Sequence, residues 1–395
     1  MNTLFLQGRA RLILFAVCGA FVAFAVSLQD TTFSNYIDVT YHISDVMRGW
    51  TELPREFPGF FMVLLAFSLF YAFGDIRLAV IANFIAAIGI IGMGFYSHNY
   101  LVFLGFTFLM QTGVHVYMPL TSSIAVTLSG GKNPGTLLGQ LQGVSTMASF
   151  CAFIFIFFGF RYFHVSYQLT YLLAAISFAI AGLLFILMLN KQIPKTKSRL
   201  LLRKRYALFY WLNILYGARK QVFLTFAPWV LIKVYHQHIE VFAILGIVGA
   251  AVGMFFKPFL GRMIDKLGER FILAAEAVVL VIICVGYAFA QRLFSNQIAL
   301  VLVFACYIID QMLMGVSMAR VTYLKKIALE PEDISPTVAM GISIDHIVSM
   351  TIPIGAGLLW YSLGYEAVFI AAALIAVVNF FSALKIRDIH QNVVG

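Results

Sequence analysis

Long apolar runs, separated by short polar connections, constrain this chain more than any other feature. Apolar residues make up 62% of its 395 residues and charged residues only 11%, whereas about a quarter of a typical soluble domain is charged. A helix needs roughly 20 apolar residues to cross a bilayer. The sequence therefore predicts an all-α membrane protein of about a dozen spanning helices joined by short loops, with no stretch polar enough for a soluble domain.

Twelve helices fit the apolar runs. Ten of them are expected at 12–38, 100–126, 135–160, 167–189, 206–233, 239–261, 270–291, 297–323, 335–362 and 365–385, and two more end near Phe73 and Tyr96. The loop 129–134 is rich in glycine and polar residues and separates two of them. One long polar stretch, 191–205, carries seven lysines and arginines and no acid. This stretch divides the chain almost in half.

A charged hinge, KPFLGRMIDKLGER, lies between the eighth and ninth expected helices. Gly261 is expected to end one helix at a point where a side chain would collide with its neighbour. Asp265 comes a turn before the next helix, where a carboxylate suits the positive end of the helix dipole. Gly268 is expected to supply the turn, and Arg270 to open the following helix. The spacing predicts a tight loop on the aqueous side of the membrane.

The pattern G-x-x-x-D-K-x-G-x-R, which includes Lys266, resembles the signature loop of the major facilitator superfamily of secondary transporters, in the copy between helices 8 and 9. In the copy between helices 2 and 3, only Gly74, Asp75 and Arg77 remain of the usual pattern. The resemblance implies a gating role for both loops. The second copy is expected to carry more of the gating contacts, because the first is degraded.

The two halves also show a weak internal repeat. Pro134 to Gly139 opens one helix as Pro336 to Gly341 opens another, and Gln111 aligns with Gln311 at a similar offset. The resemblance implies two pseudo-symmetric six-helix halves, 1–190 and 206–395, joined by the basic cytoplasmic linker 191–205.

Lysines and arginines fall mainly on alternate loops. If the N-terminus is cytoplasmic, the outer loops hold only Arg161, Lys233 and Arg292. Cytoplasmic loops carry such an excess of positive charge, so both termini and the linker are expected in the cytoplasm of a bacterial inner membrane. Topology then explains most of the net charge of +10, and no nucleic-acid partner is expected. The linker is expected to lie against anionic lipid, in preference to a regulatory partner.

Ionisable side chains inside a membrane are costly and usually line a cavity or pair with one another. In the first half, Arg48, Glu52 and Arg55 share one helical stripe, because spacings of three and four residues lie on one face. They are expected to line a cavity, although the outer end of a long, solvated helix would carry the same charges. Asp30 on the first helix and Gln111 on the fourth are further candidates.

In the second half, Arg219 and Lys220 lie side by side in an apolar run. Two adjacent cations need acids or an anionic solute nearby, so we expect each to pair with Asp310 or Asp345. Such a pair can also be purely structural. The complete candidate set for binding a solute is Arg48, Arg55, Gln111, Asn213, Tyr216, Arg219, Lys220 and Gln311.

The buried acids suggest proton coupling. Burial raises the pKa of a carboxylate and a neighbouring arginine lowers it. An acid whose partner moves between two conformations therefore takes up a proton in one and releases it in the other. The candidates for this role are Asp30, Glu52, Asp310, Asp345 and His346.

We therefore expect a secondary transporter that moves a small organic solute by alternating access, coupled to protons and acting as a monomer. A multidrug/proton antiporter is the alternative, although the region from Gly139 to Ser149 lacks the proline of the antiporter motif. An uptake symporter or uniporter, and a sensor of the same fold that does not transport, also stay open. An enzyme is not expected, because no catalytic set or metal-ligand spacing is present, and neither a cofactor nor a metal is expected. The regular layout leaves no room for the re-entrant segment of a channel.

Overall fold

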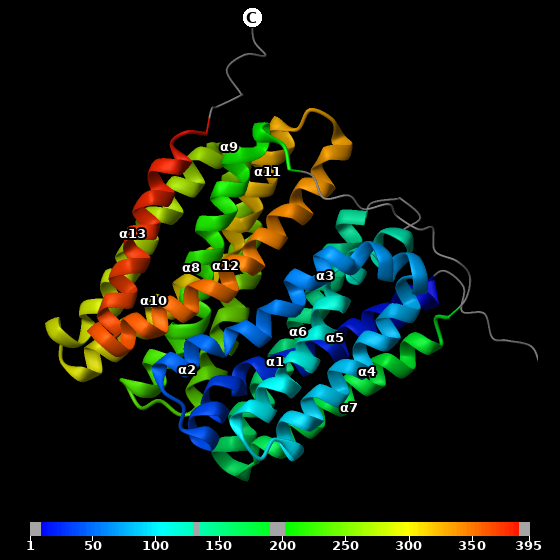
Figure 1. Ribbon diagram of the computed structural model, residues 1–395, viewed down its shortest axis with the longest axis horizontal. Coiled ribbons are helices and arrows are strands. Elements are labelled where there is room, and N and C mark those ends of the chain that lie inside the picture. The colour runs from blue at the N-terminus through cyan, green and yellow to red at the C-terminus, as the bar shows by residue number, and fades with distance from the viewer. Residues whose placement is uncertain (1–8, 129–133, 190–201, 387–395) are drawn as a thin grey trace, which may run out of the picture. The chain divides into compact units, whose positions relative to one another are not determined.

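The computed structural model describes residues 9–128, 134–189 and 202–386 (Figure 1). Residues 129–133 of the loop expected at 129–134 and most of the linker 191–205 lie outside these residues. Within the described ranges every regular element is helical. The helices are α1 (Arg9–Tyr41), α2 (Asp45–Trp50), α3 (Glu52–Phe73), α4 (Asp75–Ile91), α5 (Tyr100–Leu128), α6 (Pro134–Phe163), α7 (Tyr167–Ile186), α8 (Ala207–Lys233), α9 (Ile239–Leu293), α10 (Asn296–Leu313), α11 (Ser317–Ile327), α12 (Ile334–Leu363) and α13 (Tyr365–Ala383).

Nine helices of the described chain are long and apolar enough to cross a membrane. One of them, α9, has 55 residues and contains a non-helical residue, Gly268. At about 1.5 Å per residue it is more than twice as long as the roughly 30 Å of a bilayer core, so it holds two of the expected spans. The helices α3 and α8 are not among the nine. The number of twelve crossings stays a prediction.

The first compact unit takes in the described parts of 1–42, 57–197 and 238–247. In it α4 packs against α5 and α7, and α1 packs against α6 and α7 (Figure 1). Its core is filled by aromatic and small apolar side chains such as Phe103, Tyr171 and Ala82.

The second compact unit takes in the described parts of 43–56, 198–237 and 248–395. Here α12 packs against α8, α2 and α13, and α8 also packs against α13 (Figure 1). The segment 43–56 belongs to the first half of the sequence, yet it packs within this unit. That placement brings charged residues of the second expected helix onto α8 and α12.

The charged hinge differs in part from the expectation. Gly268 supplies the break, with φ 79° and ψ 162°, a backbone conformation that is essentially limited to glycine. The expectation for Gly261 is wrong, because it lies inside α9 and a Cβ there would meet no heavy atom of a neighbouring described residue within 4 Å. Asp265 and Lys266 are exposed and precede the break, and the exposed Arg270 follows it.

The degraded copy of the loop has the same backbone turn. Gly74 precedes α4 with φ 73° and ψ 158°, which matches Gly268. The acid that follows Gly74 is Asp75, and the acid that follows Gly268 is Glu269, so Glu269 is the structural equivalent of Asp75. Sequence spacing aligns Asp75 with Asp265 instead, because spacing alone does not show which glycine turns.

Both acids bond to the neighbouring helix of their own unit. Asp75 accepts a hydrogen bond from the hydroxyl of Ser123 on α5. Glu269 accepts one from Nζ of Lys326 on α11, at 2.8 Å. A carboxylate at the start of a helix also suits its dipole. In both loops, therefore, a carboxylate directly after the turning glycine bonds to the C-terminal part of a later helix.

Gly268→Ala is expected to destabilise the protein by about 1–3 kcal/mol, because a Cβ is strained at this positive φ. Gly261→Ala on the same helix is the matched control and is expected to leave stability unchanged or slightly raised, since alanine favours a helix. Thermal unfolding of the purified variants in detergent would measure both. Equal melting temperatures for the two variants would contradict the assignment of the turn to Gly268.

Candidate functional site

The carboxylate of Glu52 is fully buried in the second unit and accepts hydrogen bonds from three side chains. Arg48 Nη1 lies 2.6 Å from Oε1, and Arg55 Nη1 lies 3.0 Å from the same oxygen. Gln221 on α8 donates from Nε2 to Oε2 at 2.9 Å. The expected stripe of Arg48, Glu52 and Arg55 is therefore formed, and α8 supplies a fourth member.

The stripe of Arg48, Glu52 and Arg55 continues across the junction between α2 and α3. Ser44 caps α2 by accepting a hydrogen bond from the backbone N–H of Met47, and Thr51 at the junction keeps a helical φ of −58° and ψ of −29°. Helical spacing therefore continues from Arg48 to Arg55, which keeps both guanidinium groups on the side of Glu52.

Two further contacts hold α2 within this unit. Trp229 on α8 donates a hydrogen bond from Nε1 to Asp45 Oδ1 at 2.7 Å. At Gly49 the backbones of α2 and α12 meet so closely that a Cβ would lie 2.2 Å from the carbonyl oxygen of Pro353. Glycine lets two helices in a membrane approach in this way.

A second ionic contact joins α8 to α12. Lys220 Nζ donates a hydrogen bond to Asp345 Oδ2, and both side chains are partly exposed. This pairing agrees with the expectation that Lys220 meets Asp310 or Asp345.

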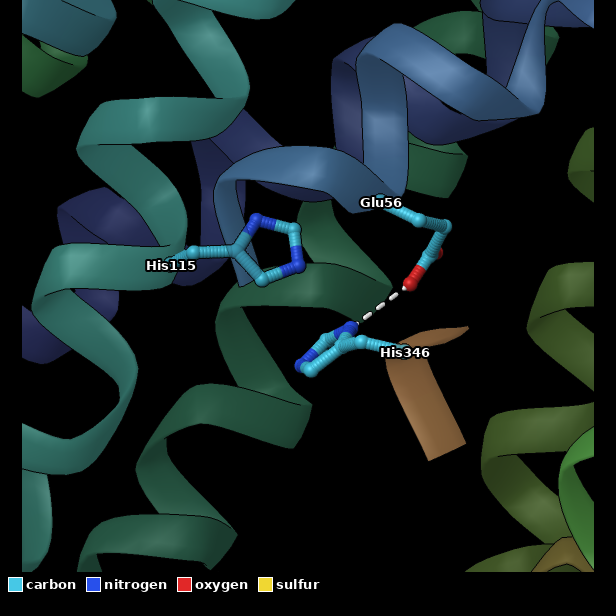
Figure 2. A group of neighbouring side chains, drawn as sticks. All are labelled: Glu56, His115 and His346. Atoms are coloured by element: carbon cyan, nitrogen blue, oxygen red, sulfur yellow. Dashed lines mark hydrogen bonds and ion pairs between the residues drawn. The ribbon is translucent and has the colours of Figure 1, made fainter. Parts of the chain in front are cut away.

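His346, the residue after Asp345, contacts Glu56 on α3. Its Nδ1 lies 2.9 Å from Glu56 Oε2, and Figure 2 shows the two side chains pointing toward each other. The two acid–base couples, Lys220–Asp345 and Glu56–His346, are thus neighbours, and their side chains are 13–17% exposed. They form a polar surface of both signs within the second unit.

Arg219 points into a different cluster from that of Lys220. Its guanidinium lies 3.3 Å from Asp310 Oδ1 on α10 and 3.7 Å from Glu276 Oε1 on α9. Arg320 on α11 lies 3.6 Å from Glu276 Oε2. The expected partner Asp310 is present, and two unexpected ones, Glu276 and Arg320, share the site.

The ring of Tyr216 on α8 lies near cations of α8 and of α11. The guanidinium of Arg320 lies 3.8 Å from the centre of its ring, and Lys220 Nζ lies 5.9 Å from it. Cations over an aromatic face are attracted by its negative quadrupole. Tyr216 therefore holds Arg320 in place.

Other candidates are not brought into these clusters. Asn213 donates to the backbone carbonyl of Phe209 on its own helix, at 2.8 Å. Gln111 is buried on α5 in the first unit, and His115, which Figure 2 also draws, has Nδ1 2.9 Å from the carbonyl oxygen of Gln111. Asp30 is exposed on α1, and Gln311 on α10 is half-buried. Asp30 therefore lacks the burial expected of a proton-coupling acid.

Four functional candidates escaped the sequence reasoning: Glu56, Gln221, Glu276 and Arg320. Glu276 and Arg320 are near helix ends in the sequence, which resembles ordinary packing or loop chemistry. Glu56 lies four residues after Glu52 and so shares a helix face with it, but Arg55 beside it was preferred as the member of the stripe. A census of every charge within the apolar runs, whatever its distance from a helix end, would have found three of them.

The comparisons with known proteins agree on the family. A sequence profile of the Major Facilitator Superfamily matches residues 15–329. None of the curated proteins compared with the chain matches it.

Several solved structures have a similar fold. A mutant of the nucleoside transporter NupG aligns with a TM-score of 0.78 at 14% identity, over 95% of this chain and 100% of that chain. A D-xylose–proton symporter aligns with a TM-score of 0.71 at 15% identity, over 96% and 97%. A bacterial homologue of the human lysosomal transporter Spinster aligns with a TM-score of 0.72 at 15% identity, over 94% and 95%.

At these identities the neighbours show the fold alone, and the match of the profile over most of the chain shows the family. The expected resemblance and the fold class are thus confirmed. The chain is a multi-pass membrane protein that belongs to the major facilitator superfamily.

Proposed function

We propose that the chain is a proton-coupled secondary transporter of a small polar organic solute. Members of the family are secondary transporters, not enzymes, and the D-xylose–proton symporter is one structural neighbour. We place the protein in a bacterial plasma membrane as a monomer, with both termini cytoplasmic, because of its loop charges. The expected halves 1–190 and 206–395, joined by the linker 191–205, complete the proposal.

The observation that carries the proposal is the pair of adjacent, partly exposed acid–base couples, Lys220–Asp345 and Glu56–His346. A fully buried pair would favour packing. A partly exposed pair can exchange its internal partner for a charged group of a solute, or for a proton, at little extra desolvation cost. Because the couples carry both signs, they fit a polar solute better than the purely anionic one suggested by the cations alone.

A thermal-stability screen of the purified protein against metabolites and drugs, at pH 6 and pH 8, tests this proposal. A ligand that binds the folded state stabilises it by mass action. A polar hit should then accumulate in proteoliposomes when a pH gradient is imposed. Hits limited to lipophilic cations would favour the multidrug/proton antiporter, and a hit that binds without any flux would favour a sensor.

Lys220→Met is expected to weaken binding of a polar hit about tenfold or more, because a hydrogen bond to a charged group contributes about 1.5–3 kcal/mol. The matched control is Lys233→Met, the same substitution at the end of the same helix. Binding would be measured as the concentration of solute that gives half-maximal stabilisation. Equal affinity of the two variants would remove Lys220 from the solute site.

A further inference from the structure

Four charged side chains from four helices meet inside the second unit. They are Arg219 on α8, Glu276 on α9, Asp310 on α10 and Arg320 on α11, and none is more than 3% exposed. Two acids and two arginines balance in charge. This set, the four-charge cluster, is distinct from the Lys220–Asp345 and Glu56–His346 couples.

The arginines of the four-charge cluster are shared unequally. Glu276 lies 3.7 Å from Arg219 and 3.6 Å from Arg320, one guanidinium at each oxygen. For Asp310 the cluster supplies only Arg219, at 3.3 Å, and that arginine is also shared with Glu276. Within the cluster, Glu276 thus pairs with two arginines, whereas Asp310 pairs with one arginine that it shares with Glu276.

The ion pairs in this cluster are loose. Strong arginine–carboxylate hydrogen bonds are about 2.7–2.9 Å long, and the distances here are 3.3–3.7 Å. Neither oxygen of Glu276, nor Oδ1 of Asp310, accepts a hydrogen bond from the described part of the chain. A buried charge is stable only when it is both paired and hydrogen-bonded. One of the two acids is therefore held weakly in its charged form.

We propose that Asp310 is the proton-binding residue of the transporter, and that Glu276 sets its proton affinity by competing for Arg219. A proton from water adds to one oxygen of the Asp310 carboxylate and makes a neutral acid. Arg219 then pairs with Glu276 alone. Protonating Glu276 instead would leave Arg320 without a carboxylate in this cluster, which costs more.

The titratable groups that face Asp310 come from three helices. They are Arg219 on α8, Glu276, Cys284 and Tyr287 on α9, and Cys306 on its own helix. Thiols and phenols are neutral at pH 7 or below in their ordinary state. Arg219 and Glu276 therefore supply the charges that decide the protonation of Asp310.

The helix that carries Asp310 ends at a turn that could move when Asp310 binds a proton. A 3₁₀ turn, Met314–Val316, separates α10 from α11, so Asp310 and Arg320 lie on opposite sides of it. Such a turn in the middle of a helix often marks a hinge. Met314 Sδ lies 3.1 Å from Nη1 of Arg219. A movement of Arg219 toward Glu276 would act directly on this turn.

The inference rests on the proposed function, but proton binding can be tested without a solute. Infrared spectra of the full-length protein in liposomes, recorded over a pH series, show the C=O band of a protonated carboxylic acid. The chain has 17 acidic residues, so the band of Asp310 is identified in the difference between the wild-type and Asp310→Asn spectra, which should contain one titrating C=O band. Glu276→Gln should keep this band and move its midpoint to lower pH by about one unit or more, because Arg219 then serves Asp310 alone.

Glu366→Gln is the control, since Glu366 pairs with the exposed Arg292 and should leave the midpoint unchanged. Glu276→Asp keeps the charge and should leave the midpoint as in the wild type, so a shift found only in Glu276→Gln comes from the loss of the charge. The absence of a titrating band from the difference between wild type and Asp310→Asn, or a midpoint of that band that does not move in a folded Glu276→Gln protein, would overturn the inference.

Flux driven by a pH gradient is a separate measurement. A wild-type protein without such flux, but with the Asp310 band, refutes the proposed proton coupling and supports the proton-binding site. The opposite result, coupled flux that is retained in Asp310→Asn, supports the proposed function and refutes the role of Asp310.

Discussion

Glu52→Ala is expected to destabilise the protein by about 3–5 kcal/mol, because removal of one partner of a buried ion pair leaves the other partner's charge uncompensated. The Arg48 side chain that pairs with Glu52 is only 1% exposed. Arg55 and Gln221 lose the same acceptor. Thermal unfolding in detergent would measure the effect, and Glu52→Gln should cost less because its amide oxygen still accepts hydrogen bonds.

The control for Glu52 is an ion pair at the surface. Arg292 is 65% exposed and pairs with Glu366, and exposed pairs contribute little because water and salt screen them. Arg292→Gln should therefore melt within the error of the wild type. If Glu52→Ala also melted there, Glu52 would not hold the segment 43–56 in place.

Gly49→Ala is expected to destabilise the protein by about 1–3 kcal/mol through overpacking. The added Cβ would lie 2.2 Å from the Pro353 carbonyl oxygen and 2.9 Å from its carbon. Both are backbone atoms that cannot rotate away, so α2 must separate from α12. Because Gly49 lies between Arg48 and Glu52, the displacement would also weaken the bond between Glu52 and Gln221. The melting temperature and the rate of solute flux should both fall.

Gly355→Ala gives the matched control on α12. A Cβ at Gly355 meets no heavy atom within 4 Å, so the same substitution should leave stability unchanged or slightly raised. Equal losses at Gly49 and Gly355 would mean that alanine acts through the helix itself and not through the contact with Pro353.

Much of the fold follows from the apolar runs. Their length, the glycine and proline positions and the charged hinge predicted the helices, and the observed ends differ by only a few residues in most cases. The hinge was harder to predict, because two glycines in one short stretch could each have supplied the turn. Gly268 turns while Gly261 does not, and a positive φ cannot be read from spacing.

Part of the site also follows from local periodicity. Residues three and four apart must share a helix face, so the contacts of Arg48, Glu52 and Arg55 were predictable. For the two cations of α8, the sequence predicted only that each would pair with either Asp310 or Asp345. Arg219 and Lys220 are neighbours in sequence but point in different directions on the helix, and each direction meets a different set of helices. Their acids, Asp310 and Asp345, are therefore different.

The sequence by itself determined the membrane, the helices, the family resemblance and the charges that must be satisfied, because these depend on composition and on short-range spacing. The tertiary structure decided which charges meet. It brought the segment 43–56 onto α8 and α12, paired His346 with Glu56, and placed Glu276 and Arg320 beside Arg219. These contacts join residues that are tens to hundreds of positions apart. Only the packing of helices, which is set by close backbone approaches such as Gly49 on Pro353, selects among them.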